Sequence, residues 1–298
     1  MRRLKIMTDD VPMASGDVFG MNDMYDNLQA YLALLVGVGT NQLDSMKHVD
    51  KNDPVKRERQ QLFKRINERF VKAFATYKLL CDDDHVLVGL SGGKDSLLLT
   101  ELLARRSRIQ HPRFQVEAVH VRMENIRYET DTTYLQQFCE DLGVPLHLVT
   151  TRFEEQQGQQ KPACFLCSWY RRKQLFNLAQ QLGCNKIALG HHQDDLLHTA
   201  LMNLLFQGRF GTMPARLQLR KMPLQIIRPL CLVPEQTIRR YAELSGYQKL
   251  VKLCPYERDT NRTTVRQLFE QAERLNPEVR YSLWNALERD GKLIETDE

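Results

Sequence analysis

The stretch HVLVGLSGGKDSLLLTELL, residues 85–103, decides the fold. It opens with a short apolar run at 85–90 that is typical of a buried strand, and a helical pattern begins at 95. Between them stands SGGKDS, residues 91–96. Its two glycines allow a tight turn whose N–H groups can approach an anion, and the start of the following helix adds a positive end. The stretch therefore predicts a phosphate-binding loop between a strand and a helix.

This loop differs from the Walker pattern G-x-x-x-x-G-K-[ST] at two positions. Val88 stands where the pattern needs glycine, and Asp95 follows Lys94 where it needs serine or threonine. Ser91 and Ser96 offer hydroxyl groups to phosphate and Lys94 offers a positive charge, but Asp95 would repel phosphate. A Mg²⁺ ion between the carboxylate and the phosphate resolves this conflict. A Gly-Gly turn with a serine or aspartate helix cap is the alternative without a ligand.

Short apolar runs and helical patterns alternate along the rest of the chain. We expect strands at 85–90, 114–121, 145–150, 185–190 and 224–230, and helices at 95–107, 132–143, 167–183 and 193–208. Helices of this length between strands predict right-handed βαβ units, and hence an α/β fold with a doubly wound, parallel five-stranded sheet. In such sheets, ligands bind at the carboxyl ends of the strands.

Composition divides the chain into three regions. We interpret residues 1–55 as an N-terminal extension, 56–230 as the α/β domain and 231–298 as a helical C-terminal region. Residues 1–55 carry five Lys or Arg against eight Asp or Glu, a net charge of −3, whereas residues 209–266 carry twelve against four, a net charge of +8. Such a basic segment suits a polyanionic partner such as RNA, and a solvated basic face is the alternative.

The bulk composition places the chain among globular proteins. Its 298 residues are 42% hydrophobic and 27% charged, which are ordinary proportions. No uninterrupted apolar run approaches the roughly 20 residues of a membrane helix, and no apolar segment of a secretory signal follows the basic start. We expect a cytoplasmic protein that does not enter membranes.

A second polar motif, ALGHHQDDLLHT at 188–199, follows the strand expected at 185–190. It crowds His191, His192, Asp194 and Asp195 into one turn at a helix start. The motif has three interpretations: a helix cap with surface histidines, a binuclear metal cluster, or carboxylates that handle Mg²⁺ or phosphate opposite loop 91–96. Because both motifs follow strands of a parallel sheet, we expect them at the same edge.

The chain holds seven cysteines, an odd number that argues against a disulfide framework. Cys164 and Cys167 form C-x-x-C at a helix start, where thiolates are stabilised. This spacing is shared by zinc half-sites, redox pairs and iron–sulfur half-sites. Cys254 stands in KLVKLCPYERDTNR, outside any apolar element. Three thiolates would hold three irons of a [4Fe-4S] cluster and leave the fourth open. We expect the remaining four to be core residues: Cys81, Cys139, Cys184 and Cys231.

The loop S-G-G-x-D-S after the first strand resembles that of the PP-loop ATP pyrophosphatase superfamily, whose members cleave ATP between the α- and β-phosphates and adenylate a substrate oxygen. The ordered set SGGKDS, C-x-x-C-S-x-x-R-R, GHHxDD, RPL and a late cysteine, spread over residues 57–285, is similar to the tRNA 2-thiocytidine synthetase family. This resemblance implies a tRNA sulfurtransferase that adenylates C2–O of a cytidine in the anticodon loop and replaces the oxygen by sulfur with a [4Fe-4S] cluster.

The resemblance also implies roles for individual residues. ATP would contact Ser91, Gly92, Gly93, Lys94, Asp95, Ser96, His120, Val121 and Gly190. Lys94, Asp95 and Asp195 would be catalytic, with Asp95 and Asp195 near Mg²⁺. The cluster ligands would be Cys164, Cys167 and Cys254. Residues proposed to bind tRNA are Arg171, Arg172, Arg209, Arg216, Arg239 and Arg240. The partners would be tRNA and a sulfur donor, either a cysteine desulfurase or sulfide; a homodimer is left open.

Some alternatives stay open on the sequence. Family members often carry a second C-x-x-C around the late cysteine, but Glu257 stands there instead, which leaves three cluster ligands. The motifs also suit a thiolase that acts on a tRNA uridine or on a small sulfur-containing molecule. A non-catalytic iron–sulfur protein that binds RNA, or a zinc site in place of the cluster, are further alternatives.

Overall fold

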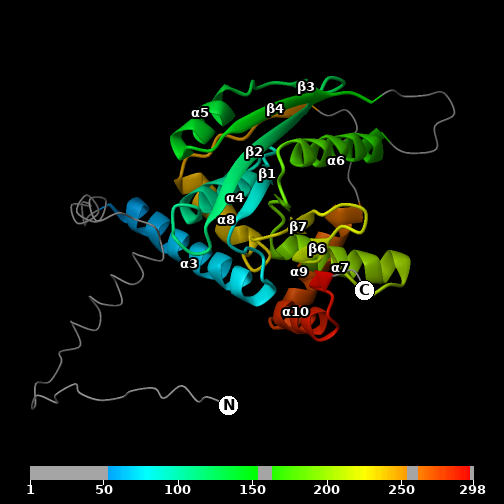
Figure 1. Cartoon of the computed structure of the whole chain (residues 1–298). Helices are drawn as coiled ribbons and strands as arrows, with labels where there is room; N and C mark the ends of the chain where they lie inside the picture. Colours follow the sequence, from blue (N-terminus) through cyan, green and yellow to red (C-terminus); the bar gives the residue numbers. More distant parts are fainter. Residues whose placement is uncertain (1–52, 154–162, 254–260, 296–298) are drawn as a thin grey trace, which may run out of the picture.

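The computed structural model describes residues 53–153, 163–253 and 261–295, and these build an α/β fold (Figure 1). The strands of its large sheet are β1 (Asp84–Gly89), β2 (Phe114–Met123), β4 (Leu146–Thr151), β5 (Lys186–Ala188), β6 (Arg216–Gln218), β7 (Gln225–Ile227) and β9 (Ile294–Glu295). Their order is β4-β2-β1-β5-β7-β6-β9. Neighbours from β4 to β7 are parallel, β6 is antiparallel to β7, and β9 is parallel to β6.

The expected class, an α/β fold with a parallel sheet, is confirmed, and all five predicted strands are present. The sheet has seven strands, however, and not five. The two extra strands, β6 and β9, contain three and two residues, which is too few to leave a periodic pattern in a sequence. β2 also continues to Met123, two residues beyond the strand predicted at 114–121.

Helices cover both faces of the sheet. They are α3 (Pro54–Tyr77), α4 (Lys94–Arg106), α5 (Thr133–Leu142), α6 (Ala163–Gln181), α7 (Gln193–Gln207), α8 (Glu235–Leu244), α9 (Asn261–Leu275) and α10 (Val279–Arg289). Because strand side chains alternate, Val86 and Val88 of β1 join one core cluster while Leu87 joins the other. The first cluster packs under α3, α4 and α8, and the second under α6, as the arrangement in Figure 1 also shows.

The C-terminal helices share the main core with the sheet. Tyr241 of α8, Phe269 of α9 and Trp284 of α10 belong to the same buried cluster as Val86 and Val88. Of the predicted extension, only residues 53–55 are described; the side chain of Asp53 caps α3 by accepting hydrogen bonds from the first turn. The boundaries at 55/56 and 230/231 therefore stay predictions.

A small second sheet lies beside the large one. β3 (Arg127–Tyr128) pairs antiparallel with β8 (Lys252–Leu253), so that Arg127 stands opposite Leu253. The segment that leads into β8 is held further by two backbone N–H groups: that of Leu250 donates to the Gly92 carbonyl at 3.0 Å, and that of Val251 donates to Thr130 Oγ1 at 2.9 Å. These contacts join the C-terminal region to the phosphate loop.

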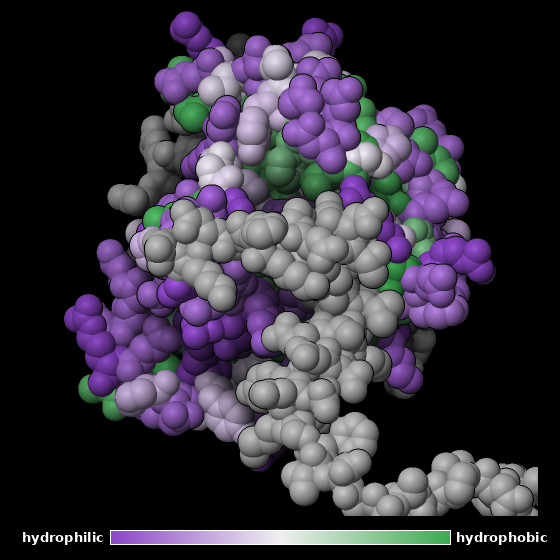
Figure 2. Space-filling view, turned by 90° about the vertical axis from the view of Figure 1, so that its left-hand side faces the viewer, coloured by the Kyte–Doolittle hydropathy of each residue, from purple (hydrophilic) through white to green (hydrophobic). Residues whose placement is uncertain are grey.

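The surface of the described chain is mainly hydrophilic on the face shown in Figure 2, where hydrophobic residues show chiefly as a patch in the upper half. Among the described helices, none is both long and apolar enough to cross a membrane. The apolar residues are instead concentrated in the core clusters, where burial of each large side chain contributes about 1.5–3 kcal/mol.

A buried ion pair joins β1 and β5 at the amino ends of these strands. Lys186 Nζ lies 2.9 Å from Asp84 Oδ2, and each side chain is only 5% exposed. Asp84 also accepts from the Cys81 backbone N–H at 2.6 Å and from Asn185 Nδ2 at 2.8 Å. Lys186 Nζ donates to the Leu79 carbonyl at 2.8 Å. The pair is thus fully hydrogen-bonded, which compensates the cost of burying two charges.

We expect Lys186→Met to lower the free energy of unfolding by about 3–5 kcal/mol, because it leaves the buried Asp84 carboxylate without its cation. Urea denaturation at neutral pH measures the change. Arg240→Met is the matched control, since Arg240 pairs with Glu58 at 2.6 Å on the surface, and it should cost far less. A Lys186→Met protein as stable as the wild type would contradict this role of the pair.

Candidate active site

The predicted phosphate loop, residues 91–96, forms a tight turn between β1 and α4. Gly92 has φ +81°, in the left-handed region that favours glycine. Ser96 Oγ donates to the Gly93 carbonyl at 2.9 Å and lies 3.0 Å from Ser91 Oγ. α4 begins at Lys94 with Gly93 as its N-cap, so no side chain caps the helix there. The N–H groups of this helix end are left available to an anion.

The GHHxDD motif packs directly on this loop. β5 lies next to β1, so the turn after β5 meets the turn after β1. A Cβ atom on Gly190 would lie only 3.0 Å from the backbone carbon of Asp95 and from the backbone nitrogen of Ser96. Only glycine allows this approach without displacing the loop. The structure therefore brings Gly190 against the loop residues with which the sequence grouped it.

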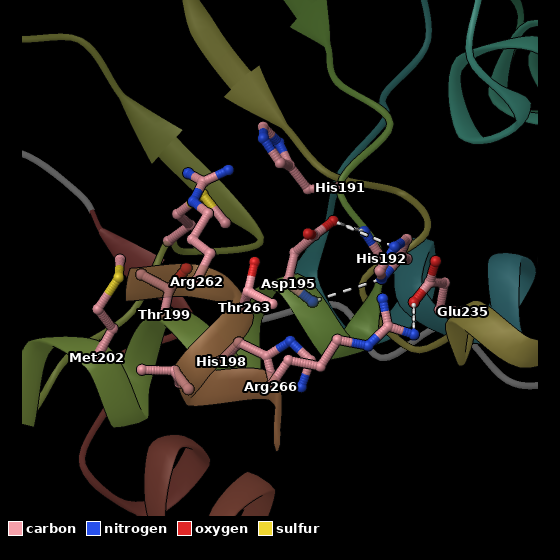
Figure 3. Close-up of a pocket in the computed structure, with 12 residues that line it drawn as sticks. His191, His192, Asp195, His198, Thr199, Met202, Glu235, Arg262, Thr263 and Arg266 are labelled. Atoms are coloured by element: carbon pink, nitrogen blue, oxygen red, sulfur yellow. Dashed lines mark hydrogen bonds and ion pairs between the residues drawn. The ribbon is translucent and has the colours of Figure 1, made fainter. Parts of the chain in front are cut away.

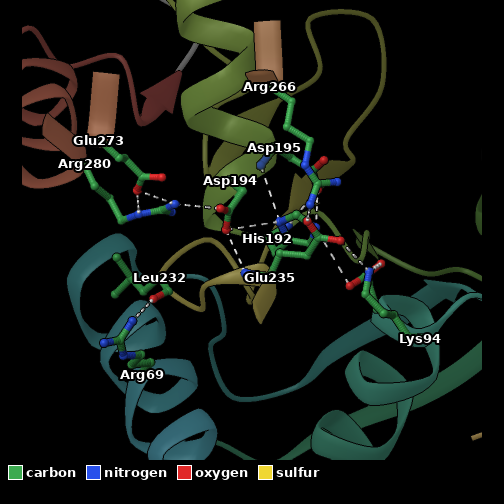
Figure 4. Close-up of polar contacts among 11 residues, drawn as sticks. Arg69, Lys94, His192, Asp194, Asp195, Leu232, Glu235, Arg266, Glu273 and Arg280 are labelled. Carbon is green, nitrogen blue, oxygen red and sulfur yellow. Dashed lines mark hydrogen bonds and ion pairs between the residues drawn. The ribbon is translucent and has the colours of Figure 1, made fainter. Parts of the chain in front are cut away.

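Lys94 of the loop lies among carboxylates (Figure 4). Its Nζ is 3.0 Å from Asp95 Oδ2 and 3.1 Å from Glu235 Oε1, and Glu235 Oε2 in turn is 3.3 Å from an Arg266 nitrogen. Burial lowers the pKa of Lys94, but Asp95 and Glu235 together raise it by more, so that it lies above its ordinary value. Lys94 is therefore fully charged and available to a phosphate.

His192 links the two motifs. Its Nε2 lies 3.9 Å from Asp95 Oδ1 and 3.5 Å from Asp195 Oδ2. His192 and Asp195 also form the capping box of α7, in which the backbone N–H of His192 donates to Asp195 Oδ2 at 3.0 Å. Asp95 Oδ1 is buried and has no hydrogen-bond partner among the described residues. An oxygen in this position suits a cation, which is the chemistry that the sequence predicts for Asp95 and Asp195.

Asp194, the neighbouring carboxylate, ties the C-terminal helices to the motif. It accepts from the Glu235 backbone N–H at 2.7 Å and from Arg280 Nη2 at 2.8 Å. Burial raises the pKa of Asp194, but the hydrogen bonds from Arg280 and from the Glu235 backbone lower it by more. Asp194 thus stays charged and holds α8 and α10 against α7, as Figure 4 shows.

A cavity of about 280 Å³ opens beside this cluster (Figure 3). Its lining comes mainly from α7, α9 and the GHHxDD turn, with one residue from α8 and one from the segment between α7 and β6. It comprises His191, His192, Asp195, His198, Thr199, Met202, Met213, Glu235, Arg262, Thr263, Val265 and Arg266. Burial lowers the pKa of His191 to about 4, with further lowering by the charges of Arg228 and Arg262. His191 is therefore uncharged at neutral pH.

Sequence reasoning missed two charged groups of the site. Glu235 follows Pro234 as the first residue of α8, where an acidic residue is ordinarily explained by the helix dipole, so only its contact with Lys94 reveals it. Arg228, in the RPL motif, is buried and donates to the Pro214 carbonyl, and its Nε has no described partner. Burial lowers the pKa of Arg228 to about 10. The RPL motif already singled out Arg228 in the sequence, but the sequence indicated no role for this side chain.

The adenosine contacts predicted from the sequence are placed at the end of β2. His120 is buried, and its Nδ1 lies 2.8 Å from the Leu90 carbonyl, directly before the phosphate loop. Burial lowers the pKa of His120, and Arg171 and Arg122 lower it further. Val121 follows on the strand and packs against the second core cluster. Their role with ATP stays a prediction.

The C-x-x-C pair lies in the first turns of α6. Cys164 is exposed and Cys167 is buried with Met123, Ile126 and Phe153. Cys254 lies outside the described residues, but Leu253, which precedes it in the chain, pairs with Arg127 of β3. In residues 53–153, 163–253 and 261–295, no group of three or more His, Cys, Asp or Glu is arranged to hold a metal ion.

Three of the four cysteines expected in the core are indeed buried. They are Cys139, Cys184 and Cys231, and burial raises the pKa of Cys139 to about 11. The expectation was wrong for Cys81, which is exposed. It follows α3 and precedes β1 in a turn, where its backbone N–H rather than its thiol makes the structural contact, with Asp84. These thiols are distant in the chain from the C-x-x-C pair.

The six arginines proposed for tRNA are spread over several elements. Arg171 of α6 donates to the Tyr128 hydroxyl at 3.3 Å, whereas Arg172 is exposed. Arg216 of β6 donates to the Lys78 carbonyl at 3.4 Å, and Arg240 of α8 pairs with Glu58. Arg209 and Arg239 are exposed. Three of the six thus contact other protein groups, and the tRNA contacts of all six stay predictions.

The fold and the loop define this chain as a PP-loop enzyme. A family profile described as a PP-loop domain matches residues 31–272. Two tRNA-cytidine(32) 2-sulfurtransferases, from Alkalilimnicola ehrlichii and Pelobacter propionicus, are 32% and 34% identical to it, each over 76% of this chain and over 73% and 86% of their own lengths. The chain belongs to the tRNA-cytidine sulfurtransferase family, as the resemblance in its motifs indicated.

A solved structure agrees with this placement. The U34-tRNA thiolase NcsA from Methanococcus maripaludis, determined with its [4Fe-4S] cluster, has a TM-score of 0.59 and 28% identity, over 75% of this chain and 78% of that chain. The similarity therefore extends across most of both proteins.

The negative charge of Glu235 stabilises the folded protein through its ion pairs with Lys94 and Arg266. This stabilisation depends on pH. Burial raises the pKa of Glu235, but Lys94 and Arg266 lower it by more, to below its ordinary 4.5. The stabilisation is therefore present above the unfolded pKa and is lost as the pH falls through the folded pKa. We expect Glu235→Gln to unfold about 1 kcal/mol more easily at neutral pH, and the difference to disappear well below pH 4.5.

Urea denaturation across this pH range measures the effect. Glu243→Gln on the same helix is the control, because Glu243 is exposed and lies 3.6 Å from Arg240. A difference between wild type and Glu235→Gln that persists unchanged in acid would show that the carboxylate charge is not its source.

Proposed function

We propose that this chain replaces the C2 oxygen of a tRNA cytidine by sulfur in an ATP-dependent reaction. The observation that carries the proposal is the meeting of two carboxylates, Asp95 and Asp195, within 4 Å of the His192 imidazole beside a phosphate loop. Family membership supplies the reaction class, and the names of the relatives supply the nucleoside.

ATP binds with its phosphates on residues 91–96. The backbone N–H groups at the start of α4 and the Lys94 ammonium hold the oxygens of the β- and γ-phosphates. Asp95 and Asp195 would hold Mg²⁺, which would supply positive charge against the repulsion between the phosphates and the two carboxylates. The unpartnered Asp95 Oδ1 supports this assignment. The adenosine lies against the end of β2, at His120 and Val121.

The chemistry then proceeds in two transfers. The C2 oxygen of the base attacks the α-phosphorus of ATP; the bond from this phosphorus to the bridging oxygen breaks, and pyrophosphate leaves. A sulfur nucleophile from the donor then adds to C2, and AMP leaves with the former base oxygen. Lys94 stabilises the charge that develops on the phosphates during the first transfer.

Cys164, Cys167 and Cys254 would hold the [4Fe-4S] cluster. The donor set suits iron, because the two described thiols stand at the start of a helix, one exposed and one buried against apolar residues. The Leu253–Arg127 pairing supports the third ligand, since it fixes the chain immediately before Cys254. When bound, the cluster supplies the iron chemistry that delivers sulfur.

We expect the Cys254→Ser and Cys164→Ser proteins to lose the cluster. Each of the three cysteines would bind one iron, and each substitution removes one of these thiolates. Iron and sulfide analysis after anaerobic purification measures this loss. Cys81→Ser is the matched control, since Cys81 is exposed and belongs to no proposed site; it should keep about four irons per chain, as [4Fe-4S] requires. Retention of four irons in Cys254→Ser would refute the ligand assignment.

Thionucleoside analysis of tRNA tests the reaction itself. We expect 2-thiocytidine to be absent from cells that lack the protein and restored by the wild-type chain. The Asp195→Asn protein should not restore 2-thiocytidine. Its fold should be kept, because the asparagine oxygen can still accept the hydrogen bond from the His192 backbone N–H and so preserve the cap of α7. Persistence of 2-thiocytidine would show that the base is another one; loss of a 2-thiouridine instead would favour a uridine, the target named for NcsA.

A further inference from the structure

The cavity between α7 and α9 is not used by ATP in the proposed reaction. Its volume of about 280 Å³ is at the low end of the roughly 300–1,000 Å³ that small-molecule sites occupy. Among the described residues that line the cavity, none belongs to loop 91–96, whereas His192 lines it and its Nε2 lies 3.9 Å from Asp95 Oδ1. A nucleobase fits this space, whereas a whole nucleoside triphosphate does not.

The lining of the cavity follows the two helices in a regular way. Asp195, His198, Thr199 and Met202 stand at i, i+3, i+4 and i+7 on one face of α7. The opposite wall comes from the first turns of α9, where Arg262, Thr263 and Arg266 face α7 in Figure 3. The cavity is therefore built into the packing of two helices and does not depend on a single loop.

The chemistry of the lining changes from one end to the other. Met202, Met213 and Val265 provide apolar surface, and thioether sulfur atoms contact aromatic rings favourably. His198 and the hydroxyl groups of Thr199 and Thr263 provide hydrogen-bonding groups without charge. Burial lowers the pKa of His198, as it does that of His191, so both imidazoles are neutral. This lining suits a flat, uncharged heterocycle better than a phosphate.

The charged groups lie at the borders of the cavity. Glu235 and Arg266 form an ion pair, whereas Arg262 is exposed and makes no ion pair with the described residues. Arg262 stands beside His191 at the cavity in Figure 3. An arginine in this position can bind the phosphodiester next to a base that has entered.

Asp195 and His192 also line the cavity, and His192 Nε2 lies 3.9 Å from Asp95 Oδ1 of the phosphate loop. A base that enters the cavity therefore meets Asp195 and, through His192, lies next to the loop. Bases in a folded tRNA loop are reached by enzymes when they leave their stack and enter a fitted pocket.

We propose that this cavity receives the target base of the tRNA, turned out of its stack, with Met202 and Met213 against its face, the uncharged polar groups of α7 and α9 at its edge, and Arg262 on the adjoining phosphate. The inference rests on the proposed function and deepens it, since it names the place where the acceptor base is held. It makes Met202, Thr199 and Thr263 residues that determine which base is accepted.

The test fills the cavity in the full chain. Met202→Trp and, independently, Met213→Trp add a large ring to the space. Leu204→Trp is the matched control, because Leu204 lies on the same helix, is 47% exposed and does not line the cavity. An anticodon stem-loop RNA with 5-fluorocytidine at position 32, the position named for the relatives, serves as the probe, and its ¹⁹F NMR signal reports where the base lies.

We expect the ¹⁹F signal to shift on binding to wild type and to Leu204→Trp, and to stay at the free position with either filled variant, although the RNA still binds. ATP affinity should be unchanged and thiolation should fall at least tenfold, which corresponds to about 1.4 kcal/mol. Thermal unfolding verifies that the variants fold. A normal ¹⁹F shift and normal thiolation in both folded filled variants would overturn the inference, and so would a loss of ATP affinity in both.

These outcomes separate the inference from the proposed function. If the wild type shifts the ¹⁹F signal and the filled variants do not, but tRNA gains no sulfur, the reaction is wrong and the base pocket stands. If the filled variants thiolate tRNA at the wild-type rate, the reaction stands and the pocket is wrong.

Discussion

The close approach of Gly190 to the phosphate loop is the contact on which the rest of the site depends. The backbone of the turn after β5 lies so near Asp95 and Ser96 that a single added methyl group would come within 3.0 Å of the loop. Because β1 and β5 are neighbours in the sheet, this contact brings together two motifs that are about a hundred residues apart in the sequence. The histidines and carboxylates of the second motif then have their positions fixed relative to the first.

Charges extend this arrangement to the C-terminal helices. Glu235 at the start of α8 bridges Lys94 and Arg266, and Asp194 holds Arg280 of α10. The Lys94–Glu235 pair joins the phosphate loop to α8, the Glu235–Arg266 pair joins α8 to α9, and the Asp194–Arg280 pair joins the second motif to α10. These helices bury their apolar faces in the same core as the sheet. The C-terminal region is thus part of the wall of the candidate site.

Sequence reasoning predicted correctly that SGGKDS and GHHxDD lie together, because the carboxyl ends of neighbouring parallel strands meet at one edge. It did not predict contacts between helices that are distant in the chain. In the sequence, Glu235 and Arg266 look like ordinary surface charges, and their ion pair exists only once α8 and α9 are packed together. Arg240, predicted to bind tRNA, forms an ion pair with Glu58 of α3. β6 and β9 were missed because strands of two or three residues leave no pattern.

The hydrogen bond from Leu250 to Gly92 couples the phosphate loop to the segment that leads into β8. The loop turn and the segment before Cys254 share this bond, and a Cβ on Gly92 would lie 2.5 Å from Leu250 Cβ. A nucleotide that reshapes the turn must therefore carry Leu250 with it or break the bond. Movement of the loop is then transmitted to the segment before Cys254. If one ligand binds at the loop and another at the end of β8, each must change the affinity of the other by the same factor.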